Sequence, residues 1–174
     1  MEKYRPTDLK NYVSDEHLKK KTKSWIKDQN IGSLLFYGPP GTGKSSLAKI
    51  LVNEIDCEYL YINASEERGI EVIRNKIQGF VYTISFKGSI KIVVLDEADY
   101  LTEVFQAALR NLMEINPSIS KFILTANYVD QIISPIRSRC QMFKITPPSK
   151  DDVKTRISWI LQQENIKYST LDFN

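Results

Sequence analysis

The sequence predicts an α/β fold, a parallel sheet with helices on both faces. One observation is the alternation of short apolar runs, bounded like buried strands, with segments of helical spacing. The strand-like runs are 34–37, 59–62, 90–95, 122–125 and 142–145. Such alternation is typical of a parallel sheet covered on both faces. A second observation is a glycine-rich loop between the first run and the helical segment that follows it.

This glycine-rich loop has the complete phosphate-binding pattern G-x-x-x-x-G-K-[ST]. Its residues are Gly38, Pro39, Pro40, Gly41, Thr42, Gly43, Lys44 and Ser45, and Ser46 follows them. Glycines let backbone N–H groups and a helix N-terminus approach an anion closely. We expect Lys44 to meet the β- and γ-phosphates and the Ser45 hydroxyl to bind Mg²⁺. The sequence therefore predicts a binding site for a nucleoside triphosphate.

An acidic stretch follows the apolar run 90–95, and it reads Asp96-Glu97-Ala98-Asp99. Ligands of open α/β sheets bind at the carboxyl ends of the strands, so these acids should face the phosphates. Asp96 is placed to hold the Mg²⁺ shell. Glu97 is placed to orient or deprotonate the attacking water. Without the phosphate loop, a solvated or helix-capping acidic loop would be the simpler interpretation.

The composition is that of one substantial folded unit. The chain has 174 residues, 42% hydrophobic and 26% charged, with a net charge of +3. No apolar run approaches the roughly 20 residues of a membrane span. Cys57 and Cys140 are too few for a disulfide framework or a zinc site, which suits a reducing cytosolic setting. The single histidine, His17, excludes multi-histidine metal sites and is expected on the surface.

Three further helical segments carry charged side chains. In a helix over about 15–29, we expect the lysines at 19, 20, 21 and 23 to form a solvated face. In a helix over 66–77, Arg68 lies near the start, where the helix dipole disfavours a cation. A nucleic-acid phosphate would relieve that conflict, and a solvated surface is the alternative. In the next helix, Gln106, Arg110 and Glu114 are spaced to pair with each other.

The remaining segments are predicted as a loop, a hinge and a helix. Residues 80–89 are predicted as a long loop, and Pro147 and Pro148 as a hinge after the last strand. Residues 151–163 are predicted as a further helix.

Six stretches, which together cover about residues 2 to 146, carry a resemblance to a known family. They are Glu2-Lys3-Tyr4-Arg5-Pro6, the phosphate loop, Asn63-Ala64-Ser65-Glu66-Glu67-Arg68-Gly69-Ile70, Asp96-Glu97-Ala98-Asp99, Thr125-Ala126-Asn127 and Ser134-Pro135-Ile136-Arg137-Ser138-Arg139-Cys140. In these stretches the chain resembles the small subunits of replication factor C clamp loaders and their phage relatives, within the AAA+ ATPases. The third stretch and Ser138-Arg139-Cys140, at the end of the last one, are not general AAA+ features.

The resemblance implies an AAA+ fold with strand order 5-1-4-3-2 and ATP with Mg²⁺ held between subunits. The segment Tyr4, Arg5 and Pro6 matches a family segment that lies near the nucleobase of ATP. Asn127 matches the sensor that positions the attacking water, a task for which an amide has both a donor and an acceptor. Arg139 matches an arginine finger that reaches the ATP of the neighbouring subunit.

The resemblance also implies partners, namely other clamp-loader subunits in a ring, a sliding clamp and primed double-stranded DNA, with no membrane. Arg68 and Arg74 fall on positions that contact the template backbone. Gln106 and Arg110 match a helix that links the DNA and ATP sites. The implied compartment is the cytoplasm, the nucleus in a eukaryote, or the host cytoplasm for a virus.

The chain departs from the family pattern at its carboxyl end. We expect an ATPase domain over 1–146, the start of a helical lid over 147–174, and no collar domain or second sensor arginine. The resemblance implies a DNA-dependent ATPase that loads a sliding clamp. The alternative is a truncated nucleotide-binding or assembly module with little intrinsic hydrolysis. A third reading, a Holliday-junction motor, is disfavoured by Ser138-Arg139-Cys140 and by Arg68-Gly69.

Overall fold

The computed structural model describes residues 4–13, 16–67, 70–83, 85, 89–115 and 117–166. The strands are β1 (Leu34–Tyr37), β2 (Cys57–Asn63), β3 (Ile90–Asp96), β4 (Ser120–Ala126) and β5 (Gln141–Lys144). The helices are α1 (Glu16–Asp28), α2 (Lys44–Glu54), α3 (Ile70–Tyr82), α4 (Glu103–Met113), α5 (Ser134–Arg137) and α6 (Lys150–Gln163). Each strand expected from the sequence is present, within two residues of its expected bounds.

The five strands form one parallel sheet in the order β2-β3-β4-β1-β5, which confirms the expected order read from the other edge. Their register sets Tyr37 level with Ala126, and Leu95 level with Leu124. The carboxyl ends of β1, β3 and β4 therefore meet at one edge of the sheet. The loops that follow these three strands are the ones that carry the predicted site residues.

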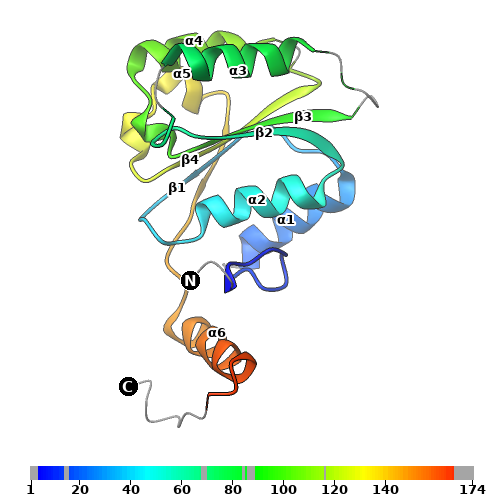
Figure 1. The fold of residues 1–174 in the computed structure, drawn as a ribbon, viewed down its shortest axis with the longest axis vertical. Helices are drawn as coiled ribbons and strands as arrows, with labels where there is room; N and C mark the ends of the chain where they lie inside the picture. Colours follow the sequence, from blue (N-terminus) through cyan, green and yellow to red (C-terminus); the bar gives the residue numbers. More distant parts are fainter. Residues whose placement is uncertain are drawn as a thin grey trace.

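Two apolar cores lie on opposite faces of the sheet (Figure 1). One joins the sheet to α1 and α2 through side chains such as Leu18, Leu47 and Leu51. The other joins it to α3, α4 and α5 through side chains such as Ile77, Leu109 and Ile136. β1 is buried on both faces, as a central strand of such a sheet must be.

Side-chain caps fix the starts of two helices. The Thr102 hydroxyl accepts a hydrogen bond from the Phe105 N–H (3.3 Å) at the start of α4. The Ser149 hydroxyl accepts one from the Asp152 N–H (3.1 Å) at the start of α6. Each cap satisfies a backbone donor that the helix itself leaves unpaired. The α4 cap matters for the site, because α4 begins a few residues after Glu97.

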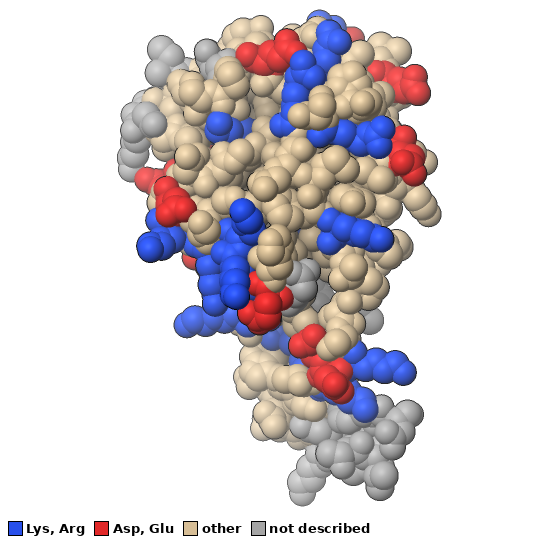
Figure 2. Space-filling model, turned by 180° about the vertical axis from the view of Figure 1, so that it is seen from behind, with Lys and Arg blue, Asp and Glu red and all other residues tan. Residues whose placement is uncertain are grey.

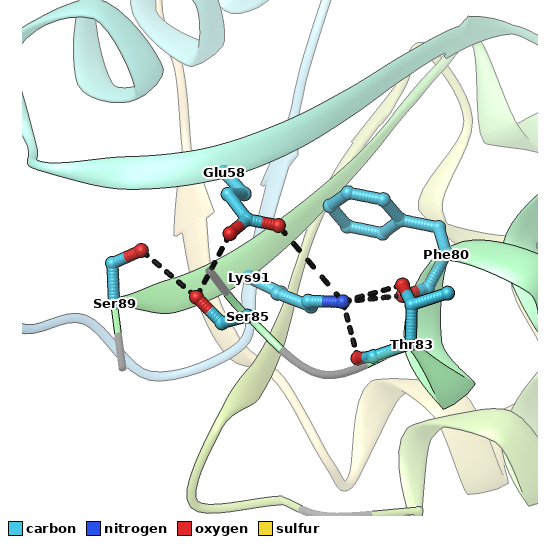
Figure 3. A network of polar contacts seen from close by, with 6 residues as sticks. All are labelled: Glu58, Phe80, Thr83, Ser85, Ser89 and Lys91. Atoms are coloured by element: carbon cyan, nitrogen blue, oxygen red, sulfur yellow. Dashed lines mark hydrogen bonds and ion pairs between the residues drawn. The ribbon is translucent and has the colours of Figure 1, made fainter. Parts of the chain in front are cut away.

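The end of α3 is anchored by a buried lysine on β3 (Figure 3). Lys91 is 1% exposed, and its ammonium donates hydrogen bonds to the Phe80 carbonyl (2.9 Å) and to both oxygens of Thr83. The Glu58 carboxylate lies 3.9 Å away. The lysine thus satisfies carbonyls at the helix C-terminus, where a cation is favourable. The predicted loop over 80–89 was therefore wrong at its start, because α3 continues through Tyr82.

Helix α6 stands apart from the layered sheet and meets the chain near its N-terminus (Figure 1). Arg156 donates hydrogen bonds to the Tyr4 carbonyl and the Asn11 side chain, both at 3.0 Å. The rings of Tyr4 and Trp159 pack edge to face at 6.1 Å. These contacts join α6 to the N-terminal segment.

Charge is mixed over the surface, and Figure 2 shows basic and acidic side chains interspersed on the back face. The α1 lysines at 20, 21 and 23 are exposed, as expected of a solvated face. No helix within the described ranges is long and apolar enough to cross a membrane.

Candidate functional site

The predicted phosphate loop joins β1 to α2, and its backbone requires glycine. Gly38, Gly41 and Gly43 have φ angles of 145°, 77° and 92°. A Cβ at Gly38 would lie 2.2 Å from the Ile145 carbonyl oxygen, so only glycine fits there. The loop borders a cavity of about 340 Å³ lined by Arg5, Pro40, Gly41, Gly43, Lys44, Ser45, Ser46, Glu97, Thr125 and Asn127. Residues from four chain segments predicted separately therefore meet around one cavity.

Lys44 lines this cavity and is 7% exposed. Its ammonium donates hydrogen bonds to the Gly38 and Pro39 carbonyls (both 2.8 Å) and to Asn127 Oδ1 (2.9 Å). Burial lowers the pKa of Lys44, while the nearby carboxylates, Asp99 first among them, act in the opposite direction. The ammonium is thus fixed with donors aimed at the phosphate loop.

Asp96 ends β3 and accepts hydrogen bonds from three hydroxyl groups. Ser45 and Thr125 donate to Oδ1 (2.8 and 2.5 Å), and Tyr61 donates to Oδ2 (2.5 Å). Burial, followed by the hydrogen bond to Asp96, raises the pKa of Tyr61. The carboxylate is therefore placed beside the Ser45 hydroxyl, as expected from the sequence. Tyr61 and Thr125 were not predicted to contact it.

Glu97 follows Asp96 and lines the same cavity as the phosphate loop. Its backbone lies in the left-handed region, with φ at 55°, and its N–H donates to the Thr125 hydroxyl (3.0 Å). A non-glycine residue in this region is uncommon, and such positions occur often at functional sites. The conformation leaves the Glu97 side chain on the cavity wall.

The N-terminal segment divides between two cavities. Tyr4 and Pro6 line a second cavity of about 260 Å³, together with Asn11, Tyr12, Val13, Gly41, Thr42, Gly43, Ser46, Pro148, Arg156 and Ile160. Arg5 instead lines the phosphate-loop cavity, and its Nε donates to the Ser46 hydroxyl (3.3 Å). Tyr4 and Pro6 thus line one cavity and Arg5 the other. The expectation that this segment lies near the nucleobase stays a prediction.

Arg139 lies at the opposite edge of the sheet from the phosphate loop. It precedes β5, whose first residue is level with the first residue of β1, whereas the loop follows the end of β1. At about 3.3 Å per residue, β1 alone separates them by roughly 13 Å. The guanidinium pairs with the Glu114 carboxylate and donates to the Pro135 carbonyl (2.7 Å). Arg139 therefore does not join the cavity of its own chain.

The predicted pairing of Gln106, Arg110 and Glu114 was wrong. The buried Gln106 side chain donates to the Leu101 and Gln131 carbonyls and accepts from the Ile133 N–H, at 2.9 to 3.0 Å. Arg110 binds the neighbouring Asn111, and Glu114 binds Arg139. The three residues are spaced four apart in the sequence, but each side chain bonds to a group outside this set of three.

The two arginines expected to contact DNA differ in what the structure describes. Arg74 is exposed on α3. Arg68 lies outside the described residues.

The two cysteines are free, and burial raises the pKa of Cys57 to about 11 and that of Cys140 to about 12. Both thiols are therefore protonated near neutral pH.

The site also contains Tyr61, which the sequence did not single out, and it gives Thr125 and Asp99 contacts that were not predicted. Each acts through a contact across the sheet or between loops. Asp99 belongs to the predicted acidic stretch but bonds backbone N–H groups after β4 rather than facing the cavity. Thr125 could have been suspected, because it is a polar residue at the end of an apolar strand next to the phosphate-loop strand.

Comparisons with known proteins agree with this architecture. Residues 34–147 match the family described as "ATPase family associated with various cellular activities (AAA)". The replication factor C small subunit of Staphylothermus marinus is 45% identical over 172 residues, which cover 95% of this chain and 52% of that protein. That of Aeropyrum pernix is 44% identical over 178 residues, covering 97% and 54%. The chain thus spans about half the length of the curated relatives it matches.

Solved structures give the same fold. A Thermotoga maritima RuvB Holliday junction branch migration motor superposes with a TM-score of 0.76, covering 94% of this chain and 56% of that one. Its sequence identity is 18%, so this likeness bears on the fold alone.

Proposed function

The chain belongs to the AAA family of ATPases, and from this premise we propose that it is the ATP-binding and ATP-hydrolysing part of a clamp-loader small subunit. The observation that carries the proposal is the meeting of Lys44, Asp96, Glu97 and Asn127 at the carboxyl edge of one sheet. Asp96 ends β3, Lys44 begins α2 after the loop that follows β1, and Glu97 and Asn127 directly follow β3 and β4. Their chemistry is that of phosphate binding, metal binding and water activation.

In this proposal the phosphate loop binds the β- and γ-phosphates. Backbone N–H groups of the loop and of the first turn of α2 point toward the anion, and Lys44 adds a positive charge. The position of Arg5 on the same cavity supports a second cationic contact with the phosphates. Glu97 accepts a proton from the attacking water or orients it. Asn127 positions the same water beside the γ-phosphate.

The donor set at Asp96 fits Mg²⁺. Ser45 supplies a hydroxyl oxygen and Asp96 a carboxylate 2.8 Å from it, and Mg²⁺ prefers such oxygen ligands together with phosphates and water. Ser45 would bind the ion directly, and Asp96 would hold its shell. When bound, Mg²⁺ would neutralise charge on the phosphate oxygens.

The cavity beside Tyr4 and Pro6 suits the nucleobase. It continues from the phosphate loop, sharing Gly41, Gly43 and Ser46 with the first cavity. Val13, Pro148 and Ile160 provide apolar walls for a planar ring. Because Arg156 and Ile160 come from α6, nucleotide binding would join α6 to the ATPase core.

Arg139 is proposed to act on a neighbouring chain. Its distance from its own phosphate loop supports action in trans, since the guanidinium would have to pass the length of β1 to act in cis. An arginine supplied by a neighbour stabilises charge in the transition state and contributes roughly 10³–10⁵ in rate in nucleotide hydrolases. An isolated chain is then the slow nucleotide-binding module of the alternative hypothesis.

The clamp-loader assignment rests on the relatives named replication factor C small subunit. The proposed partners are other clamp-loader subunits in a ring, a sliding clamp and primed double-stranded DNA. Arg68 and Arg74 would contact phosphates of the template. We propose the domain boundaries expected above, an ATPase domain over 1–146 and the start of a lid over 147–174.

ATP turnover by the assembled complex, with and without primed DNA and clamp, tests this function. We expect both the primed DNA and the clamp to stimulate turnover.

Replacing Arg68 and Arg74 by Ala should lower the slope of log affinity for DNA against log salt by about 1.8, since each lost phosphate contact on duplex DNA accounts for about 0.9. The matched control is the double variant Lys20→Ala with Lys21→Ala. These lysines lie on α1, which packs on the opposite face of the sheet from α3. Turnover indifferent to DNA and clamp would favour the assembly-module alternative.

A further inference from the structure

Asp99 is a buried carboxylate next to the proposed catalytic residues, with no role in the proposed reaction so far. It lies in a short 3₁₀ helix (Ala98–Tyr100) directly after Glu97 and is 8% exposed. Its Oδ2 accepts hydrogen bonds from the backbone N–H groups of Asn127 (3.0 Å) and Tyr128 (3.2 Å). The loop after β3 is thereby tied to the loop after β4.

These two backbone groups need a partner from outside the sheet. β4 ends at Ala126, so the ladder of strand hydrogen bonds stops one residue before Asn127. Backbone N–H groups at such a position require an acceptor if they are not to lose free energy. Asp99 supplies one oxygen for both, and a hydrogen bond to a charged acceptor is stronger than one to a neutral acceptor.

The other oxygen of the same carboxylate argues against a purely stabilising role. Asp99 Oδ1 is buried and has no hydrogen-bond partner among the described residues. A buried carboxylate with one oxygen unsatisfied is costly, and a well-packed neutral side chain would often be as stable. The charge of Asp99 is better explained by the backbone N–H groups that it holds in place.

What Asp99 holds is the backbone that carries the Asn127 side chain. Asn127 Oδ1 lies 2.9 Å from the Lys44 ammonium, at the wall of the phosphate-loop cavity. A shift of its backbone by one ångström would move the amide out of reach of a phosphate or a water. The charge of Asp99 also acts to raise the pKa of Lys44, against the larger lowering effect of burial.

We propose that Asp99 is a positioning residue for ATP hydrolysis, which sets the Asn127 side-chain amide at the γ-phosphate by anchoring the N–H groups of residues 127 and 128. This inference rests on the proposed function, since it assumes that Asn127 meets the γ-phosphate. It gives the last acid of the Asp96-Glu97-Ala98-Asp99 stretch a task distinct from those of the first two.

Two variants separate anchoring from general stability. Asp99→Ala removes both oxygens, whereas Asp99→Asn keeps the shape and one acceptor oxygen. The matched control is Asp130→Ala, which removes an acid near the same loop that is 96% exposed and 3.9 Å from Arg137. Nucleotide affinity is measured with a fluorescent ATP analogue, and turnover is measured at high protein concentration with Lys44→Ala chains added to supply Arg139.

We expect Asp99→Ala to lower turnover by about 100-fold, the scale of a one-ångström misplacement, with nucleotide affinity changed by less than about threefold. Asp99→Asn should retain most of the turnover, and Asp130→Ala all of it. Unchanged turnover in Asp99→Ala would overturn the inference. So would an equal loss of affinity and turnover in both Asp99 variants, because a structural role alone would account for it.

An NMR readout separates this inference from the proposed function. In the wild-type chain, the side-chain amide resonances of Asn127 should shift on adding ATPγS and shift less with ADP. In nucleotide-bound Asp99→Ala, that difference should disappear, and hydrogen exchange should rise at residues 127 and 128 but not in β1 or β3. A wild-type chain without the difference would count against Asn127 as the sensor. A difference retained in Asp99→Ala would count against Asp99 alone.

Discussion

The two edges of the sheet hold their charged residues in different ways. At the carboxyl edge, Lys44 and Asp96 are 7% and 6% exposed, and each makes three hydrogen bonds. At the amino edge, the side chains of Arg139 and Glu114 are 35% and 53% exposed and pair with each other. A buried network is rigid, whereas an exposed ion pair contributes only about 0–1 kcal/mol.

The difference in burial between the two edges fits two tasks, binding the chain's own nucleotide and meeting a ligand on another chain. Groups that bind the chain's own nucleotide gain from being fixed beforehand, because no reorganisation is needed when the phosphates arrive. A group that must meet a ligand on another chain has to leave its resting partner. If Arg139 acts in trans as proposed, the Glu114 carboxylate occupies the place on the guanidinium that a phosphate of the neighbour would take.

The largest effect is expected at the carboxyl edge, from Glu97→Gln. The amide still orients a water but cannot accept its proton, so turnover should fall by about 10²–10⁴. Nucleotide affinity should stay close to that of the wild type. Glu103→Gln, an exposed acid at the start of α4, is the control. Turnover at the wild-type rate would remove Glu97 from the proposed mechanism.

Lys44→Ala should lower the affinity for ATP by about 100-fold, because charge-assisted hydrogen bonds to phosphate are lost from a buried position. Lys49→Ala, on the exposed side of the same helix, should change it little. Isothermal titration of the two variants with Mg·ATP makes the comparison. If Lys44→Ala binds ATP as tightly as the control, the cavity is not the phosphate site.

Gly38→Ala should destabilise the carboxyl edge without removing any charged group. The added Cβ would meet the Ile145 carbonyl oxygen at 2.2 Å, and φ at 145° is strained for any L residue. We expect a loss of about 1–3 kcal/mol in the free energy of unfolding. Denaturant titration measures it, with Gly32→Ala as the control, since nothing lies within 4 Å of a Cβ there. Equal midpoints for the two variants would contradict the tight approach at Gly38.

The smallest effect is expected at the amino edge, from Glu114→Gln. Arg139 would no longer have to leave a carboxylate before meeting a phosphate, so turnover at a given protein concentration should rise. The gain should stay below about fivefold, the limit set by an exposed ion pair. A loss of turnover would mean instead that Glu114 guides Arg139 toward the neighbour.

The comparison also shows what the sequence could predict. Local signals located the strands, the phosphate loop and the acids, because apolar runs and glycine spacing are set by neighbours in the chain. The strand order and the sensor position came from the family resemblance. The structure then confirmed the order and put Asn127 beside Lys44.

Contacts between distant segments were not predictable. Asp99 meets the N–H groups of residues 127 and 128, and Arg139 meets Glu114, across 25 or more positions in the chain. Arg5 lines the phosphate-loop cavity, although its neighbours Tyr4 and Pro6 line the second cavity. No pattern of spacing encodes such pairs, because they depend on how strands stack in the sheet and which loops then meet.

The central claim is that the nucleotide site is completed by Arg139 of a second chain, and a mixing experiment tests it most directly. Lys44→Ala chains have an intact Arg139, and Arg139→Ala chains have an intact nucleotide site. Neither variant alone should turn over ATP appreciably. Their mixture should regain turnover that rises with protein concentration. Brisk hydrolysis by Arg139→Ala chains alone, independent of concentration, would contradict the account, because the site would then be complete within one chain.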